Sequence, residues 1–165
     1  MVIPRTLNQQ RGDLGEQFAR EWINKNLNCL KCKHSRGKLK DLLGSFSAVD
    51  LICEFCGQMY QVKTNTNPVH RFPPSLLGAG FNALEARMDA GIYHPLIIVG
   101  FIEGNGGPLG LVRHWKATAS IWYLSADLID PKMYVSYHAL IKGVRPHVGT
   151  KINTALVEKR FVKLK

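Results

Sequence analysis

The stretch VDLICEFCGQMYQVKTN, residues 49–65, combines a pair of cysteines with three polar side chains. In chain order these residues are Asp50, Cys53, Cys56, Gln61 and Lys63. If the cysteine pair forms the turn of a hairpin, the chain reverses there, and Asp50 returns beside the strand that carries Gln61 and Lys63. The stretch therefore predicts a hairpin that brings an acid, an amide and an amine to one place.

The four cysteines of the chain form two Cys-x-x-Cys pairs. The first is Cys29 with Cys32 and the second is Cys53 with Cys56, with twenty residues between the pairs. Two pairs at this distance match a site in which four thiolates surround one zinc ion and leave no position open for catalysis. A thioredoxin-like redox pair and four unrelated buried thiols are the alternatives. We predict a structural Zn²⁺.

The charge balance is strongly basic. The chain has 22 Lys and Arg residues against 12 Asp and Glu, a formal net charge of +10 over 165 residues. A surplus of this size predicts a polyanionic partner, nucleic acid before an anionic membrane, although basic surfaces also serve solubility alone. The first residues are too polar for a secretion signal, and no apolar run has membrane-spanning length. We therefore expect a cytoplasmic protein without a membrane partner, and reduced cysteines.

The hydrophobic pattern predicts a mixed α/β domain. Helices are expected over residues 14–27, where apolar side chains recur at helical spacing, and over 76–91. Strands are expected over 58–64, 94–103, 111–117 and 119–129, with a hairpin turn at 104–110. Together these elements predict one domain, residues 1–165, with a central mixed sheet. Residues 28–57 would contain the zinc element, and 142–165 a basic C-terminal segment.

Glu16 lies on the first predicted helix, in line with an apolar row that includes Ala19 and Ile23. A carboxylate directed along a buried face is typical of a site, although Glu near a helix start is also favoured by the helix dipole. With Asp50, Gln61 and Lys63 it completes a set suited to phosphodiester hydrolysis. The oxygens of Asp50 and Gln61 would bind Mg²⁺, and the Lys63 ammonium would stabilise the attacking hydroxide or the developing charge.

This arrangement resembles the PD-(D/E)xK nuclease superfamily, and within it the DpnI-type restriction endonucleases, which cut adenine-methylated DNA. The resemblance rests on the two cysteine pairs, Asp50 and Gln61-x-Lys63, and extends over residues 10–157. It implies a restriction-endonuclease-like core, in which helices flank a central mixed sheet and a zinc-ribbon hairpin is inserted before and within the catalytic strands. It also implies a Mg²⁺-dependent endodeoxyribonuclease that acts on double-stranded DNA.

Two features depart from the resembled family. Gln61 stands where that family has Glu, a variant that is typical of the similar Mrr-type nucleases and lowers the negative charge of the site by one. His147 stands where the family has an aromatic residue in its DNA-contacting segment. Whether adenine methylation is required, and whether two copies pair on DNA to cut both strands, therefore stay open.

Basic residues in two segments are predicted to contact DNA. Phosphate contacts are expected from the loop after the first helix and from the basic C-terminal segment. The predicted residues are Lys38, Lys40, Arg145, His147 and Lys151. The competing functions are a zinc-ribbon DNA-binding protein without catalysis and a nuclease of Holliday-junction-resolvase type.

Overall fold

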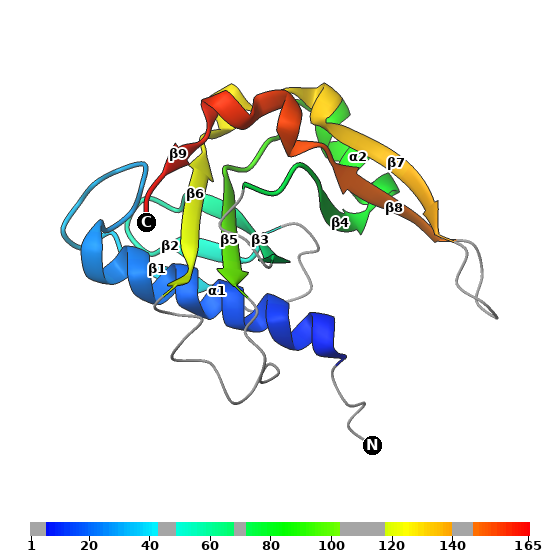
Figure 1. The fold of residues 1–165 in the computed structure, drawn as a ribbon. Helices are drawn as coiled ribbons and strands as arrows, with labels where there is room; N and C mark the ends of the chain where they lie inside the picture. The colour runs from blue at the N-terminus through cyan, green and yellow to red at the C-terminus, as the bar shows by residue number, and fades with distance from the viewer. Residues whose placement is uncertain (1–5, 43–48, 68–71, 103–117, 140–146) are drawn as a thin grey trace, which may run out of the picture.

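The computed structural model describes residues 6–42, 49–67, 72–102, 118–139 and 147–165 (Figure 1). Within these ranges six strands form one sheet in the order β1-β2-β3-β5-β6-β9. Their bounds are β1 Leu39–Asp41, β2 Leu51–Cys53, β3 Met59–Asn67, β5 Leu96–Ile102, β6 Ser120–Leu124 and β9 Val162–Lys163. β3 and β5 pair in parallel, whereas the other neighbours are antiparallel. The mixed α/β class with a central mixed sheet is confirmed.

The first helix, α1, spans Leu7–Asn26 and begins seven residues before the predicted start at 14. A capping box explains the early start. The Thr6 hydroxyl accepts from the Gln9 backbone N–H, and the Gln9 side chain accepts from the Thr6 N–H. Glu16 consequently lies in the middle of the helix rather than near its start, so the helix dipole does not explain it.

Two hydrophobic clusters lie on opposite faces of the central strands. Phe18, Ala19 and Ile23 of α1 pack in one cluster that also contains Tyr60 and Val62 of β3. Figure 1 shows α1 running across the strands of the larger sheet. The α1 face of β3 therefore carries the even-numbered residues, because strand side chains alternate between faces.

Gln61 and Lys63 belong to the other face of β3. In the parallel pairing Gln61 is in register with Leu96, and Lys63 with Ile98. Leu96 and Ile98 belong to the second hydrophobic cluster. The predicted alternation, with Gln61 and Lys63 pointing one way and their neighbours the other, is confirmed.

The prediction of one helix over residues 76–91 is wrong at its beginning. Leu76–Gly80 form strand β4, and helix α2 spans only Phe81–Asp89. Glycines at 78 and 80 weaken helix formation there, and β8 offers an antiparallel partner strand. β4, β8 (His147–Ile152) and β7 (Tyr134–Ala139) form the smaller sheet, in that order. Three short 3₁₀-helices complete the described chain: η1 Ala126–Leu128, η2 Pro131–Met133 and η3 Thr154–Arg160.

The other predicted elements have mixed outcomes. The buried strand predicted over 94–103 is β5, and Leu96, Ile97 and Ile98 have no exposed surface. The segment 119–129, predicted as a strand that runs into a loop, contains β6, Ser120–Leu124, followed by η1. The turn at 104–110 and the strand at 111–117 lie outside the described residues. Across the part of the chain that the structure describes, no helix combines the length and apolarity needed to cross a bilayer.

Candidate functional site

The four cysteines converge, as their spacing predicts. Their sulfur atoms all lie within 4.8 Å of one another. Cys29 Sγ lies 3.7 Å from Cys56 Sγ, and Cys32 Sγ lies 4.0 Å from Cys53 Sγ. A zinc ion with bonds of about 2.3 Å to four thiolates would separate neighbouring sulfurs by roughly 3.8 Å. The cluster therefore fits one tetrahedral zinc ion, and the four thiols are free rather than joined in disulfides.

Local backbone features bring the two cysteine pairs together. The second pair occupies the turn between β2 and β3, where Gly57 adopts φ +69° and the N–H of Gly57 donates to the Cys53 carbonyl. The first pair follows α1 in a loop that closes around Gly37. A Cβ at this glycine would lie 2.9 Å from Cys29 Cβ, from Cys32 Sγ and from the His34 carbonyl oxygen. Only glycine lets the loop close this tightly on the sulfur cluster.

Asp50 lies beside β3, where the hairpin prediction placed it. Its backbone N–H donates to the Tyr60 carbonyl, and its Oδ2 accepts from the Val62 N–H at 2.6 Å. Burial raises the pKa of Asp50, while the charge of Lys63 and the hydrogen bond from Val62 act in the opposite direction. The carboxylate therefore lies within electrostatic range of the Lys63 ammonium, in surroundings where its negative charge is poorly solvated.

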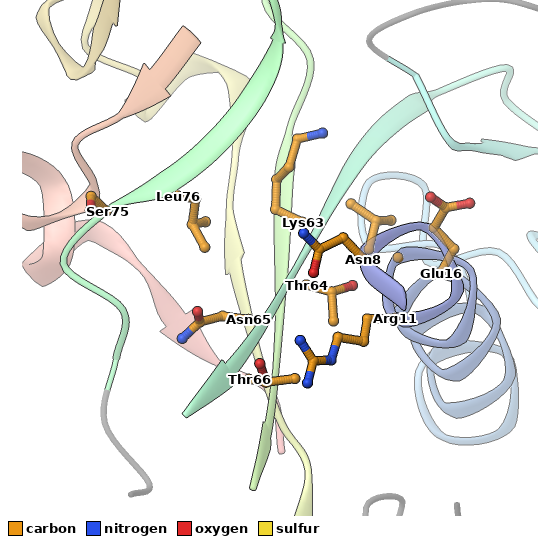
Figure 2. Close-up of a pocket in the computed structure, with 11 residues that line it drawn as sticks. Asn8, Arg11, Glu16, Lys63, Thr64, Asn65, Thr66, Ser75 and Leu76 are labelled. Atoms are coloured by element: carbon orange, nitrogen blue, oxygen red, sulfur yellow. The ribbon is translucent and has the colours of Figure 1, made fainter. Parts of the chain in front are cut away.

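A cavity of about 440 Å³ lies between α1 and β3, with Lys63 in its lining, and reaches Ser75 and Leu76. Its lining includes Glu16 and Arg11 from α1 and Lys63 and Asn65 from β3. Figure 2 shows the Lys63 side chain projecting from β3 and the Glu16 side chain projecting from α1. Glu16 from α1 and Lys63 from β3 therefore both line the cavity, although α1 packs on the opposite face of β3 from Lys63.

α1 and β3 are in close contact beside the cavity. A Cβ at Gly15 would lie 1.9 Å from Thr64 Oγ1 and 2.9 Å from Thr64 Cβ. Because residue 15 is glycine, the helix backbone rests directly on the Thr64 side chain. Glu16 follows Gly15 in α1, next to this contact.

Gln61 does not contribute to the lining of the cavity. Its side chain lies on the same face of β3 as Lys63, but the residue is only 6% exposed and is not among those that line the cavity. Asp50 is not a lining residue either. Of the predicted set, the cavity lining contains Glu16 and Lys63, and Asp50 is linked to Lys63 through an electrostatic interaction.

The basic residues predicted to contact DNA are dispersed. The Lys38 ammonium donates to the Asn24 carbonyl and to Asn28 Oδ1, both at 2.6 Å, and so ties the loop to the end of α1. Lys40 forms an ion pair with Glu54. Lys151 is exposed on β8 in the smaller sheet. Arg145 and the side chain of His147 lie outside the described residues.

The sequence interpretation missed Thr64, Asn65, Thr66 and Ser75 of the cavity, and it missed two polar residues of α1, Asn8 and Arg11. Both precede residue 14, where the helix was predicted to begin. The Thr6 to Gln9 capping pattern was the signal that could have extended the helix to include them.

Comparison with known proteins assigns no family to the chain. No protein-family model matches it, and no curated protein sequence matches it. The similarity to PD-(D/E)xK nucleases therefore stays a prediction that depends on the residues and on their geometry.

Proposed function

We propose that the protein is a Mg²⁺-dependent DNA endonuclease of the PD-(D/E)xK type. The observation that supports this most strongly is the position of Asp50. The Asp50 carboxylate accepts a hydrogen bond from the backbone N–H of Val62, the residue between Gln61 and Lys63. The positive charge of Lys63 acts to lower the pKa of the Asp50 carboxyl group. Burial disfavours the charged carboxylate there, and a bound divalent cation would compensate for that penalty.

Each residue of the proposed site has a distinct role. When bound, Mg²⁺ would polarise the scissile phosphate and acidify a water molecule. Asp50 would be the anionic ligand of Mg²⁺, and its hydrogen bond from Val62 keeps it beside β3. The Lys63 ammonium stabilises the attacking hydroxide and the charge that develops on the phosphate. Glu16, which lines the cavity with Lys63, orients the attacking water.

The zinc site has a supporting role in this proposal. The cysteine cluster joins the loop after α1 to the turn between β2 and β3. It therefore fixes the end of the hairpin that connects Asp50, just before β2, to Lys63 in β3. Four thiolates complete the zinc coordination, so the ion supplies no catalytic position.

The net charge of +10 supports DNA as the substrate, because counterion release favours binding of a basic protein to phosphate backbones. We further propose that the nuclease recognises DNA as restriction endonucleases do, with or without a requirement for adenine methylation. This proposal is tested by digestion of one plasmid prepared with and without adenine methylation, in Mg²⁺ or Mn²⁺, followed by sequencing of the ends. Cleavage that depends on the divalent ion supports the nuclease, and intact plasmid in both preparations contradicts it.

One observation favours a second candidate, a zinc-ribbon DNA-binding protein without catalysis. Gln61 is buried and does not line the cavity, so the expected second oxygen ligand does not face it. This candidate predicts salt-sensitive DNA binding without nicking in either metal. A matched assay on branched and linear DNA separates both candidates from a junction-specific nuclease.

A further inference from the structure

An exposed aromatic group stands on the zinc element, at the tip of the turn between the second pair of cysteines. Phe55 is 48% exposed, although most large apolar side chains of the described chain are buried. The His34 ring lies flat against it, with ring centroids 3.8 Å apart and 4° between the planes. The Arg36 guanidinium carbon lies 5.5 Å from the centroid of the Phe55 ring. We call these three residues the knuckle platform.

The knuckle platform is held rigidly. Phe55 lies between Cys53 and Cys56, and His34 and Arg36 belong to the loop of the other cysteine pair. The backbone N–H of Arg36 donates to His34 Nδ1 at 3.1 Å. Neutral His34 consequently carries its proton on Nε2, which remains a donor for a ligand. Aromatic side chains with few free rotamers bind at a low entropic penalty, so this arrangement is organised before any partner arrives.

The surroundings of the platform are cationic. Lys31, Lys33 and Arg36 are all exposed on the same loop. Glu54, the acidic neighbour of Phe55, is paired with Lys40. His34 covers one face of the Phe55 ring and the Arg36 guanidinium lies over the ring, so a base would add to the end of this stacked group. Partly exposed aromatic rings with exposed cations around them suit a nucleobase flanked by phosphates. In a paired duplex the base faces are covered by stacking, so the partner must offer an unpaired base.

We propose that the knuckle platform binds an unpaired nucleobase of DNA by stacking, while Lys31 and Lys33 neutralise the adjacent phosphates. The proposal takes DNA as the partner from the proposed function but does not depend on cleavage. The platform follows the C-terminal end of α1, whereas the cavity lies against residues 8–16 of that helix. At 1.5 Å per residue, the two sites are roughly 20 Å apart along the helix. The platform is therefore a second contact on DNA, distinct from the cavity.

The test measures the affinity of the zinc-loaded full chain for a labelled twelve-nucleotide single strand and for its duplex, without added divalent ion. Phe55→Ala is expected to weaken single-strand binding by about tenfold, since one base stacked on an aromatic ring contributes on that order. Duplex binding should change by less than about twofold, because the duplex is held through phosphates. Phe55→Trp should restore the affinity, and its added fluorescence should be quenched by the single strand.

Leu156→Ala is the matched control, because Leu156 is an apolar side chain that is also exposed, at 55%, but lies far from the cysteines in the chain. It should leave both affinities unchanged, and the zinc content of every variant should equal that of the unmodified chain. An unchanged single-strand affinity in Phe55→Ala, or an equal loss on single strand and duplex, would overturn the stacking proposal. Plasmid cleavage by Phe55→Ala and by the unmodified chain is measured separately. The affinities test the stacking proposal and the cleavage tests the nuclease proposal, so failure of one is distinguished from failure of the other.

Discussion

The carboxylate of Asp50 accepts a hydrogen bond from the backbone N–H of Val62, with 2.6 Å between oxygen and nitrogen. Val62 stands between Gln61 and Lys63, so this bond fixes the position of the acid relative to the amine. Burial raises the pKa of the same carboxyl group. The folded protein without a cation therefore holds Asp50 in surroundings that disfavour its charge, which is typical of a residue kept for function rather than for stability.

Asp50→Asn should stabilise the zinc-loaded protein at neutral pH when no Mg²⁺ is present. The pKa of Asp50 is higher in the folded protein than in the unfolded chain. The stabilising contribution of the Asp50 carboxyl group is therefore fully present below the usual Asp range, and it is lost as the pH rises through the folded pKa. Asn retains the acceptor for the Val62 N–H and carries no charge. We expect a rise in Tm of about 2–4 °C at pH 7, equivalent to about 1 kcal/mol at this chain length, and no rise near pH 3.

The control for this measurement is Asp89→Asn, because Asp89 is exposed at the end of α2. Its Tm should follow that of the unmodified protein at every pH. Destabilisation of Asp50→Asn at pH 7 would mean that the carboxylate is there to stabilise the fold, which contradicts the proposed role.

Two glycines of α1 should respond oppositely to alanine. A Cβ at Gly15 collides with Thr64, which is stiff in its strand, whereas a Cβ at Gly12 meets nothing within 4 Å. Gly12→Ala should stabilise the protein by about 0.5–1 kcal/mol through helix propensity alone. Gly15→Ala should destabilise it by about 1–2 kcal/mol, because overpacking outweighs that gain. Denaturant unfolding measures both values.

Gly15→Ala should also slow DNA cleavage by about tenfold or more, because displacement of α1 moves Glu16 away from Lys63 and small displacements of catalytic groups lower rates steeply. Cleavage at the original rate by a folded Gly15→Ala protein would remove Glu16 from the proposed site.

Zinc binding should depend on Gly37. Alanine there would place a methyl group 2.9 Å from Cys29 Cβ, from Cys32 Sγ and from the His34 carbonyl. We expect Gly37→Ala to weaken zinc affinity by about tenfold, the order found when the surroundings of metal ligands are changed. Competition with a chromophoric chelator gives the affinity. Ser35→Ala, at an exposed position of the same loop, is the control and should bind zinc like the unmodified chain.

The hairpin was predictable from the sequence because its determinants are local. Two Cys-x-x-Cys pairs, a turn at Gly57 and alternation along β3 are all encoded within short stretches, and the structure confirms the convergence of the sulfur atoms. The return of Asp50 to β3, where its Oδ2 accepts from the Val62 N–H, follows from the same reversal of the chain. Strand β5 could equally be predicted from the sequence, since a continuous apolar run indicates a buried strand.

Features set by distant partners were not predictable in this way. Leu76–Gly80 became a strand because β8 pairs with it. Gln61 was expected in the metal site, but its burial depends on what packs over its face of β3, which no local pattern gives. Lys38 resembles any exposed cation in the sequence, yet its ammonium is bound by Asn24 and Asn28.

The most direct test of the proposed site is the rate at which supercoiled plasmid is nicked in Mn²⁺ by Lys63→Met, compared with the unmodified chain. Lys25→Met, an exposed lysine at the end of α1, is the matched control for loss of one positive charge. If Lys63 stabilises the transition state beside Asp50, nicking should fall by about 100-fold or more while Lys25→Met and zinc content stay unchanged. Equal nicking by both variants, or none by the unmodified chain, would contradict the proposed active site.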